Sequence, residues 1–154
     1  MRVVDAAMLT ALEAHGTQTN KHDGELYALH LARVWINASE RGGTKVQQAI
    51  AWLHDSVEDT PLTLQSLQFL LIDRIDLPHG GVIDAIVAGV DGMTKRNGET
   101  LEEYYRRCKD NPDSRFVKLH CDIVDNFRRN YLIADDEKRL KMAYKYSMGV
   151  DILT

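Results

Sequence analysis

A histidine and three acids stand close together near the middle of the sequence, directly after an apolar run. They form the pairs His54-Asp55 and Glu58-Asp59. A neutral imidazole nitrogen beside a carboxylate is a donor set that suits a divalent transition metal. Two further carboxyl groups one helical turn away could position an activated water and exchange protons with it. The alternative is a helix end with a solvated acidic tail, and these four residues alone leave both interpretations open.

Two residues cannot hold a metal tightly, so further ligands must come from other segments. His30 shares a predicted helix face with Leu26 and Val34 and therefore points inward, although a lone inward histidine is more often a satisfied core residue than a ligand. Asp122 belongs to a polar stripe on a predicted helix that is otherwise apolar. A buried carboxylate is costly unless it is paired or bound to a metal. Asp122 either pairs with Lys118 one turn earlier or faces a cation, and the spacing permits both.

Helical periodicity predicts the elements that must position these residues. Apolar residues recur at spacings of three and four, and glycine, proline and asparagine separate the periodic segments, as at Pro78–Gly81. The last segment is expected to be an amphipathic helix that carries Leu140 and Tyr144. No strand and no internal repeat is predicted, so the fold class is all-α in a single domain, residues 1–154. The expected helices cover residues 3–14, 25–38, 45–57, 63–71, 82–90, 100–108, 114–129 and 135–148.

The composition limits the classes of partner. A chain of 154 residues can bury the core of one domain, and its net charge of −4 gives no general attraction to nucleic acid or an anionic membrane. Cys108 and Cys121 cannot form a disulfide framework and fit no zinc-finger spacing. No segment resembles a membrane span or a signal peptide. We expect a cytoplasmic protein with no nucleic-acid or membrane partner; an oligomer is open, but no apolar stripe indicates one.

Three motifs together resemble those of the HD-domain metal phosphohydrolases. They are Tyr27-x-x-His30, His54-Asp55-x-x-Glu58-Asp59-Thr60 and Asp122-x-x-x-Asn126-x-Arg128. Within that family the chain is similar to the (p)ppGpp hydrolase domains of Rel/SpoT proteins and to the stand-alone small alarmone hydrolases. His15-Gly-Thr-Gln18 and Val90-Asp-Gly-Met-Thr94-Lys95 also match, so the resemblance covers about residues 11–130. It implies an HD-domain helical bundle.

The resemblance also implies a role for each site residue. The implied metal ligands are His30, His54, Asp55 and Asp122, and the implied catalytic acids are Glu58 and Asp59. The implied substrate-binding residues are Lys21, His22, Asn126 and Arg128. A nitrogen and oxygen ligand set without thiolate favours manganese or iron and also accepts zinc, nickel or cobalt. The resemblance selects manganese (Mn²⁺).

The implied activity is removal of the 3′-pyrophosphate from (p)ppGpp, a small-molecule nucleotide of the stringent response, to give GDP or GTP. Two alternatives stay open: an HD phosphohydrolase for another nucleotide or an NADPH-like cofactor, and a non-catalytic metal or nucleotide binder. The chain departs from the family pattern at Leu31, where proline is usual, and at Lys21, where arginine is usual. The segment Val117–Asp122 has one residue more than the usual Lys-Leu-Ala-Asp, which shifts Lys118 relative to Asp122.

Overall fold

The computed structural model describes residues 1–76 and 80–154 and confirms the all-α prediction: within these ranges the only β feature is an isolated bridge between Thr19 and Leu26. Of the predicted break at Pro78–Gly81, Pro78 and His79 lie outside the described residues. The elements are α1 (Val3–His15), α2 (Tyr27–Glu40), α3 (Lys45–Leu53), α4 (Ser56–Asp59), α5 (Leu64–Arg74), α6 (Gly80–Met93), α7 (Leu101–Asp110), α8 (Pro112–Val117), the π-helical turn η1 (Lys118–Asp122), α9 (Ile123–Arg128), the 3₁₀ turn η2 (Asn130–Leu132) and α10 (Asp136–Leu153).

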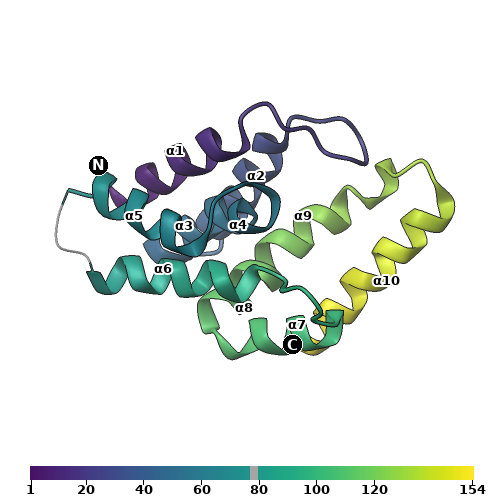
Figure 1. Cartoon of the computed structure of the whole chain (residues 1–154). Coiled ribbons are helices and arrows are strands. Elements are labelled where there is room, and N and C mark those ends of the chain that lie inside the picture. The colour runs from purple at the N-terminus through teal and green to yellow at the C-terminus, as the bar shows by residue number, and fades with distance from the viewer. Residues whose placement is uncertain (77–79) are drawn as a thin grey trace.

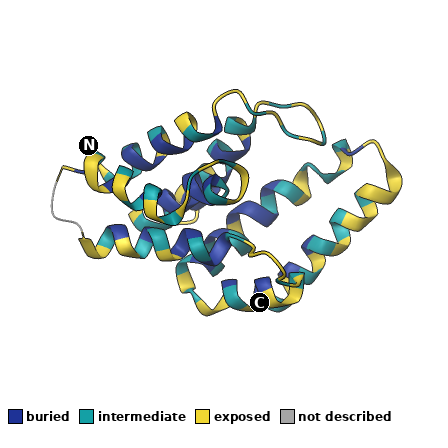
Figure 2. Cartoon of the chain, viewed as in Figure 1, coloured by how far each residue is buried: buried dark blue, intermediate teal, exposed yellow. Residues whose placement is uncertain are grey.

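The core is built around α3, which packs against α1, α2 and α6 and is the most deeply buried helix (Figures 1 and 2). A capping box between Thr44 and Gln47 starts α3 and satisfies its first backbone N–H groups. The contact between α3 and α6 requires a glycine at position 89. A Cβ atom there would lie 2.2 Å from Cδ1 of Ile50. The two helices can therefore approach closely at the level of the candidate site.

The helix predicted over residues 45–57 is interrupted. α3 ends at Leu53, His54 and Asp55 form a turn, and α4 begins at Ser56. The imidazole Nδ1 of His54 lies 2.8 Å from the carbonyl oxygen of Ala51 and satisfies one of the free carbonyls at the helix end. The turn aims the His54 and Asp55 side chains at one point, which consecutive residues of a straight helix could not do.

The helix predicted over residues 114–129 has a π-helical turn at its centre. α8 begins after Asn111, whose side chain accepts hydrogen bonds from the backbone of Asp113 and Ser114. The turn η1 then holds one residue more than an α-helical turn would, and α9 continues from it. A π-helical turn absorbs an inserted residue without rotating the flanking segments out of register. The extra residue between Val117 and Asp122 is accommodated in this way.

α10 follows a reversal after η2 and returns beside α9 and α7 (Figure 1). It runs to Leu153, five residues beyond the predicted end at Met148. Leu140 and Tyr144 are each 71% exposed, so they do not form the buried apolar face of the predicted amphipathic helix. The buried residues of α10 are Tyr146, Gly149 and Leu153.

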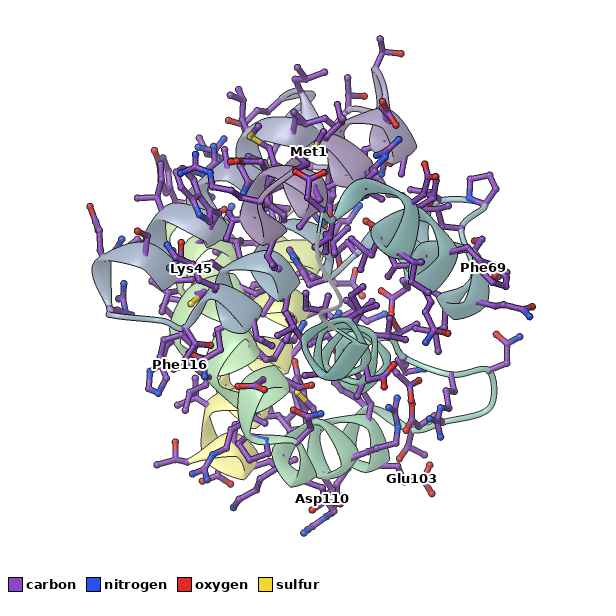
Figure 3. All side chains as sticks on the ribbon, turned by 90° about the vertical axis from the view of Figure 1, so that its left-hand side faces the viewer. Met1, Lys45, Phe69, Glu103, Asp110 and Phe116 are labelled. Atoms are coloured by element: carbon purple, nitrogen blue, oxygen red, sulfur yellow. The ribbon has the colours of Figure 1, made fainter. Side chains whose placement is uncertain are left out.

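The helix α5 extends to Arg74, and α6 covers residues 80–93 rather than 82–90. Phe69 of α5 lies at the periphery with its side chain 64% exposed (Figure 3). Among the described residues, no helix combines the length and the apolar character that crossing a bilayer requires.

Candidate metal centre and active-site cleft

His30 of α2, His54 of the turn after α3 and Asp122 of η1 direct donor atoms at one point, all within 4.8 Å of one another, and Asp55 adjoins His54. Nε2 of His30 lies 3.4 Å from Nε2 of His54 and 3.2 Å from Oδ1 of Asp122. Nε2 of His54 lies 3.5 Å from the same oxygen and 2.9 Å from Oδ2 of Asp55. These separations are those of neighbouring ligands around a single ion whose bonds are about 2.0–2.2 Å long. His30, His54 and Asp122 are all buried.

The opposite nitrogen of each imidazole fixes the proton on the ring. Nδ1 of His54 faces the carbonyl oxygen of Ala51, which can only accept a hydrogen bond, so Nδ1 carries the hydrogen. Nδ1 of His30 lies 2.8 Å from Oδ2 of Asp125 and carries the hydrogen for the same reason. In the neutral rings both Nε2 lone pairs therefore point at the shared space. A carboxylate or carbonyl behind the ring is the usual support of a metal-binding histidine.

The charges around this point are balanced by the donors themselves. Burial lowers the pKa of His54, but the carboxylates of Asp55 and Asp122 outweigh that effect and raise the pKa well above its usual value. Burial raises the pKa of Asp122, but the ammonium group of Lys118 and the imidazole of His54 hold it well below the usual range. Two imidazoles and two ionised carboxylates fit a divalent cation of the manganese, iron or zinc class.

Each of the two candidate carboxylate ligands accepts hydrogen bonds from neighbouring side chains. Nζ of Lys118 donates to Oδ2 of Asp122 over 2.7 Å, and the side-chain amide of Asn126 donates to Oδ1 over 2.9 Å. The hydroxyl of Tyr27 donates to Oδ2 of Asp55 over 2.5 Å. The predicted pairing of Asp122 with Lys118 is confirmed, and the other oxygen of Asp122 faces the two histidines, where a cation would be held.

Asp55 and Asp122 line a polar cleft of about 260 Å³, and His30 and His54 adjoin these two carboxylates without lining the cleft themselves. Asp55, Glu58 and Asp59 contribute carboxylates to this cleft. The α1–α2 loop (residues 16–26) contributes Lys21, and α10 contributes Lys145. The residues that line the cleft are Gln18, Thr19, Asn20, Lys21, His22, Tyr27, Asp55, Glu58, Asp59, Tyr105, Lys118, Asp122, Asn126, Met142, Lys145 and Tyr146.

Glu58 and Asp59 both reach the cleft from the short helix α4. An oxygen of Glu58 accepts a hydrogen bond from the backbone N–H of Lys95 over 2.8 Å, which fixes its carboxylate. Burial and the nearby charges of Asp55 and Glu58 raise the pKa of Asp59 to about 6. A carboxyl group in this range can both release and accept a proton near neutral pH.

The structure brings three of the four predicted substrate-binding residues to the cleft. Lys21, His22 and Asn126 line it, whereas Arg128 lines a separate apolar groove between α9 and α10. Two residues along an α-helix rotate a side chain by about 200°, so Arg128 cannot share the face of Asn126. Burial and the charge of Lys138 lower the pKa of His22, so this ring is neutral near pH 7 and offers a hydrogen bond rather than a positive charge.

The sequence did not single out the residues that α10 contributes. Lys145, Met142 and Tyr146 form part of the cleft wall. Lys145 belongs to a run of basic residues that resembles an ordinary solvated face, so only the orientation of α10 distinguishes it. Lys118 and Lys145 both line the cleft, and burial and the charge of Lys118 lower the pKa of Lys145.

No protein-family profile matches the sequence, and no curated protein matches it. Among solved structures, the chain is similar to a metazoan ortholog of SpoT that hydrolyses ppGpp and plays a role in starvation responses. The two chains share 21% sequence identity with a TM-score of 0.77, over 99% of this chain and 86% of the other. At this level of identity the likeness shows a shared fold, in agreement with the helical bundle that the sequence predicts.

Proposed function

We propose that the chain is a metal-dependent phosphohydrolase that removes the 3′-pyrophosphate from (p)ppGpp-like guanosine nucleotides. The observation that carries the proposal is the grouping of His30, His54 and Asp122, with Asp55 next to His54, beside a cleft that also holds two acids and several lysines. The shared fold with a ppGpp hydrolase supports the choice of substrate. We propose Mn²⁺ as the ion that the four residues hold.

A divalent ion held by these residues supplies Lewis acidity and lowers the pKa of water. The protein groups then manage the protons. Hydrolysis breaks the bond between phosphorus and the ribose 3′ oxygen, so the attacking water loses a proton and the leaving oxygen gains one. Glu58, fixed by the backbone of Lys95, positions the water. Asp59, whose pKa is about 6, accepts the proton of the water and can return it to the leaving group.

Lysine side chains in the cleft oppose the negative charge of the substrate. Lys21 and Lys145 both line the cleft and provide positive charge for the phosphate oxygens. Asn126 is held by Asp122, and its remaining amide atoms can meet the nucleotide. Because Lys21 is a point charge rather than a guanidinium fork, it orients a phosphate less strictly than the arginine that is usual here.

The experiment is a substrate panel. Purified protein loaded with Mn²⁺ is incubated with ppGpp, deoxynucleoside triphosphates, cyclic nucleotides and NADPH, and the products are separated by ion-exchange chromatography. We expect pyrophosphate and GDP from ppGpp. Release of orthophosphate or of a nucleoside from another compound would instead support a different phosphohydrolase, and no product from any compound would support a non-catalytic binder.

Glu58→Gln tests the assigned acid. The substitution keeps the shape and the hydrogen bond from Lys95 but removes the negative charge, and it leaves the four metal donors intact. We expect turnover to fall by about 10²-fold, the usual cost of misplacing a reacting group. Glu102→Gln, on an exposed surface pair with Arg106, is the matched control. Turnover of Glu58→Gln equal to that of the control would remove Glu58 from the mechanism.

A further inference from the structure

A continuous network of ion pairs joins the candidate ligand His30 to the loop that faces the substrate. Behind the His30 ring, Asp125 accepts from Nδ1 with Oδ2 over 2.8 Å. The other oxygen of Asp125 accepts from Nε of Arg33 over 2.6 Å. Asp125 is only 4% exposed, so both of its oxygens are committed to these two partners.

The same arginine also contacts the α1–α2 loop. Its two terminal nitrogens donate to the two oxygens of Glu25 over 2.7 and 2.8 Å, a bidentate pair. Arg129, the C-cap residue of α9, makes further ion pairs with this loop. Its guanidinium lies 3.3 Å from Glu25 and donates to Asp23 over 2.7 Å. The guanidinium of Arg33 thus bridges a carboxylate that orients His30 and a carboxylate of the loop.

The tip of that loop carries the cleft residues Lys21 and His22. Asn20 organises the tip, since its backbone carbonyl accepts from Gly24 over 2.9 Å and its side chain accepts from the backbone of His22 over 2.8 Å. The backbone N–H of Asn20 in turn donates to the carbonyl of Glu25 over 2.7 Å. The tip is therefore a compact unit whose position depends on where Glu25 is held.

We propose that Arg33 is a positioning residue that couples the imidazole of His30 to the α1–α2 loop through Asp125 and Glu25. This inference rests on the proposed function for the roles of His30 and Lys21. Arg33 touches neither the reacting atoms nor the cleft; it acts through the two carboxylates. A guanidinium has the planar set of donors that this geometry needs, because Nε and one terminal nitrogen donate to Asp125 while both terminal nitrogens donate to Glu25.

Arg33→Met tests the coupling with two measurements that do not need turnover. The substitution keeps the apolar stem and removes every donor. Mn²⁺ affinity, measured by electron paramagnetic resonance, should fall by about tenfold, the lower end of the effect of groups that support metal ligands. Amide hydrogen exchange over residues 16–26, measured by mass spectrometry, should accelerate by about tenfold as the loop opens more readily.

Arg74→Met is the matched control. The Arg74 side chain is mostly buried and pairs with Glu13 of α1, away from the cleft. Glu25→Gln weakens the bridge at its loop end and leaves the bonds to Asp125 intact: it should accelerate exchange in the loop and, because the two ends are coupled, also lower Mn²⁺ affinity by a smaller factor than Arg33→Met does. It also keeps the test available should Arg33→Met not fold.

The coupling is overturned if Arg33→Met matches the control in both measurements, or if only one of the two changes. A protein that binds Mn²⁺ and shows both changes, yet releases no pyrophosphate from ppGpp, would overturn the proposed function and leave the coupling established.

Discussion

Tyr27 carries a hydroxyl that supports one candidate ligand from outside the metal centre. Its ring stacks on His15 with 5.1 Å between the centroids, and its hydroxyl donates to Asp55. Burial and the charge of Asp55 raise the pKa of Tyr27 far above its usual value, so the hydroxyl keeps its hydrogen at all physiological pH values. Asp55 is thereby held with one oxygen toward His54.

Tyr27→Phe retains the stacked ring and removes only the hydroxyl. Because Asp55 then loses the donor that orients it, we expect Mn²⁺ affinity to fall by about tenfold, with little change in the melting temperature of the metal-free protein. Isothermal titration calorimetry measures the affinity. Tyr131→Phe, at a side chain that is 75% exposed, is the control. Equal affinity of the two variants would show that the hydroxyl does not orient the ligand.

The raised pKa of Asp59 predicts how stability depends on pH. Its value moves from 3.8 to about 6 on folding, so between these pH values the native state binds more protons than the unfolded state. Stability from this group is therefore present below pH 3.8 and is lost as pH rises through 6. Asp59→Asn removes the repulsion by Asp55 and Glu58 and should raise the melting temperature at pH 7 relative to wild type more than it does at pH 4.

This pH prediction is checked by thermal denaturation of both proteins in the presence of a chelator. The motif implied a catalytic role for Asp59, but its raised pKa depends on how closely Asp55 and Glu58 lie in the folded chain. A difference in melting temperature between the variant and the wild type that is the same at both pH values would contradict the assigned pKa.

At the scale of the elements, the π-helical turn η1 makes a prediction that an ordinary helix would not. Deleting the exposed residue His120 should convert η1 into a regular α-helical turn and leave α8 and α9 in register. Lys118 and Asp122 would then be three residues apart and still share a face. We expect a folded protein that binds Mn²⁺, as seen by circular dichroism and metal titration.

Deleting Val124 from the regular helix α9 is the control. That deletion rotates the rest of α9 by about 100° and removes Asp125 and Asn126 from their places, so Mn²⁺ binding should be lost. If both deletions abolish binding equally, η1 does not absorb an inserted residue.

The elements also show where sequence reasoning stops. Periodicity predicted the existence of the helices that carry the site, but not the break between α3 and α4, because Val57 continues the apolar pattern across it. The break depends on a bond from His54 to the backbone of Ala51, and side-chain chemistry of this kind leaves no periodic signal. The extra residue before Asp122 was visible, but whether the helix would bulge or shift required the structure.

At the scale of the whole molecule, the candidate centre joins segments that are far apart in the chain. Its donors come from α2, the turn after α3, and η1. A ligand that binds only the folded state at a hundredfold excess over its dissociation constant adds about 2.7 kcal/mol of stability. For a chain of this size that corresponds to a rise of about 5–10 °C in melting temperature.

Differential scanning fluorimetry with Mn²⁺ and with chelator measures this rise. His30→Gln should abolish it, because the variant removes a donor without adding charge. His120→Gln, at an exposed histidine, should keep the full rise. A protein whose melting temperature does not respond to any divalent transition metal would have no ion linking these segments.

The all-α fold class could be anticipated from helical periodicity, and the grouping of His30, His54 and Asp122 from the resemblance of their motifs to those of a known family. The roles of Arg33 and Lys145 could not. Arg33 pairs with Asp125, which lies 92 positions later in the chain, and nothing local distinguishes it from an ordinary surface arginine. Such partners are selected only when the helices pack.

The division of the cleft between early and late segments has a consequence for synthesis. Every candidate metal donor precedes residue 123, whereas Met142, Lys145 and Tyr146 stand on the last helix. Because synthesis runs from the N-terminus, the growing chain contains every donor before it contains that wall. Ion capture can therefore precede completion of the nucleotide pocket, and a chain truncated before α10 would expose its ion to solvent from the side that the wall normally covers.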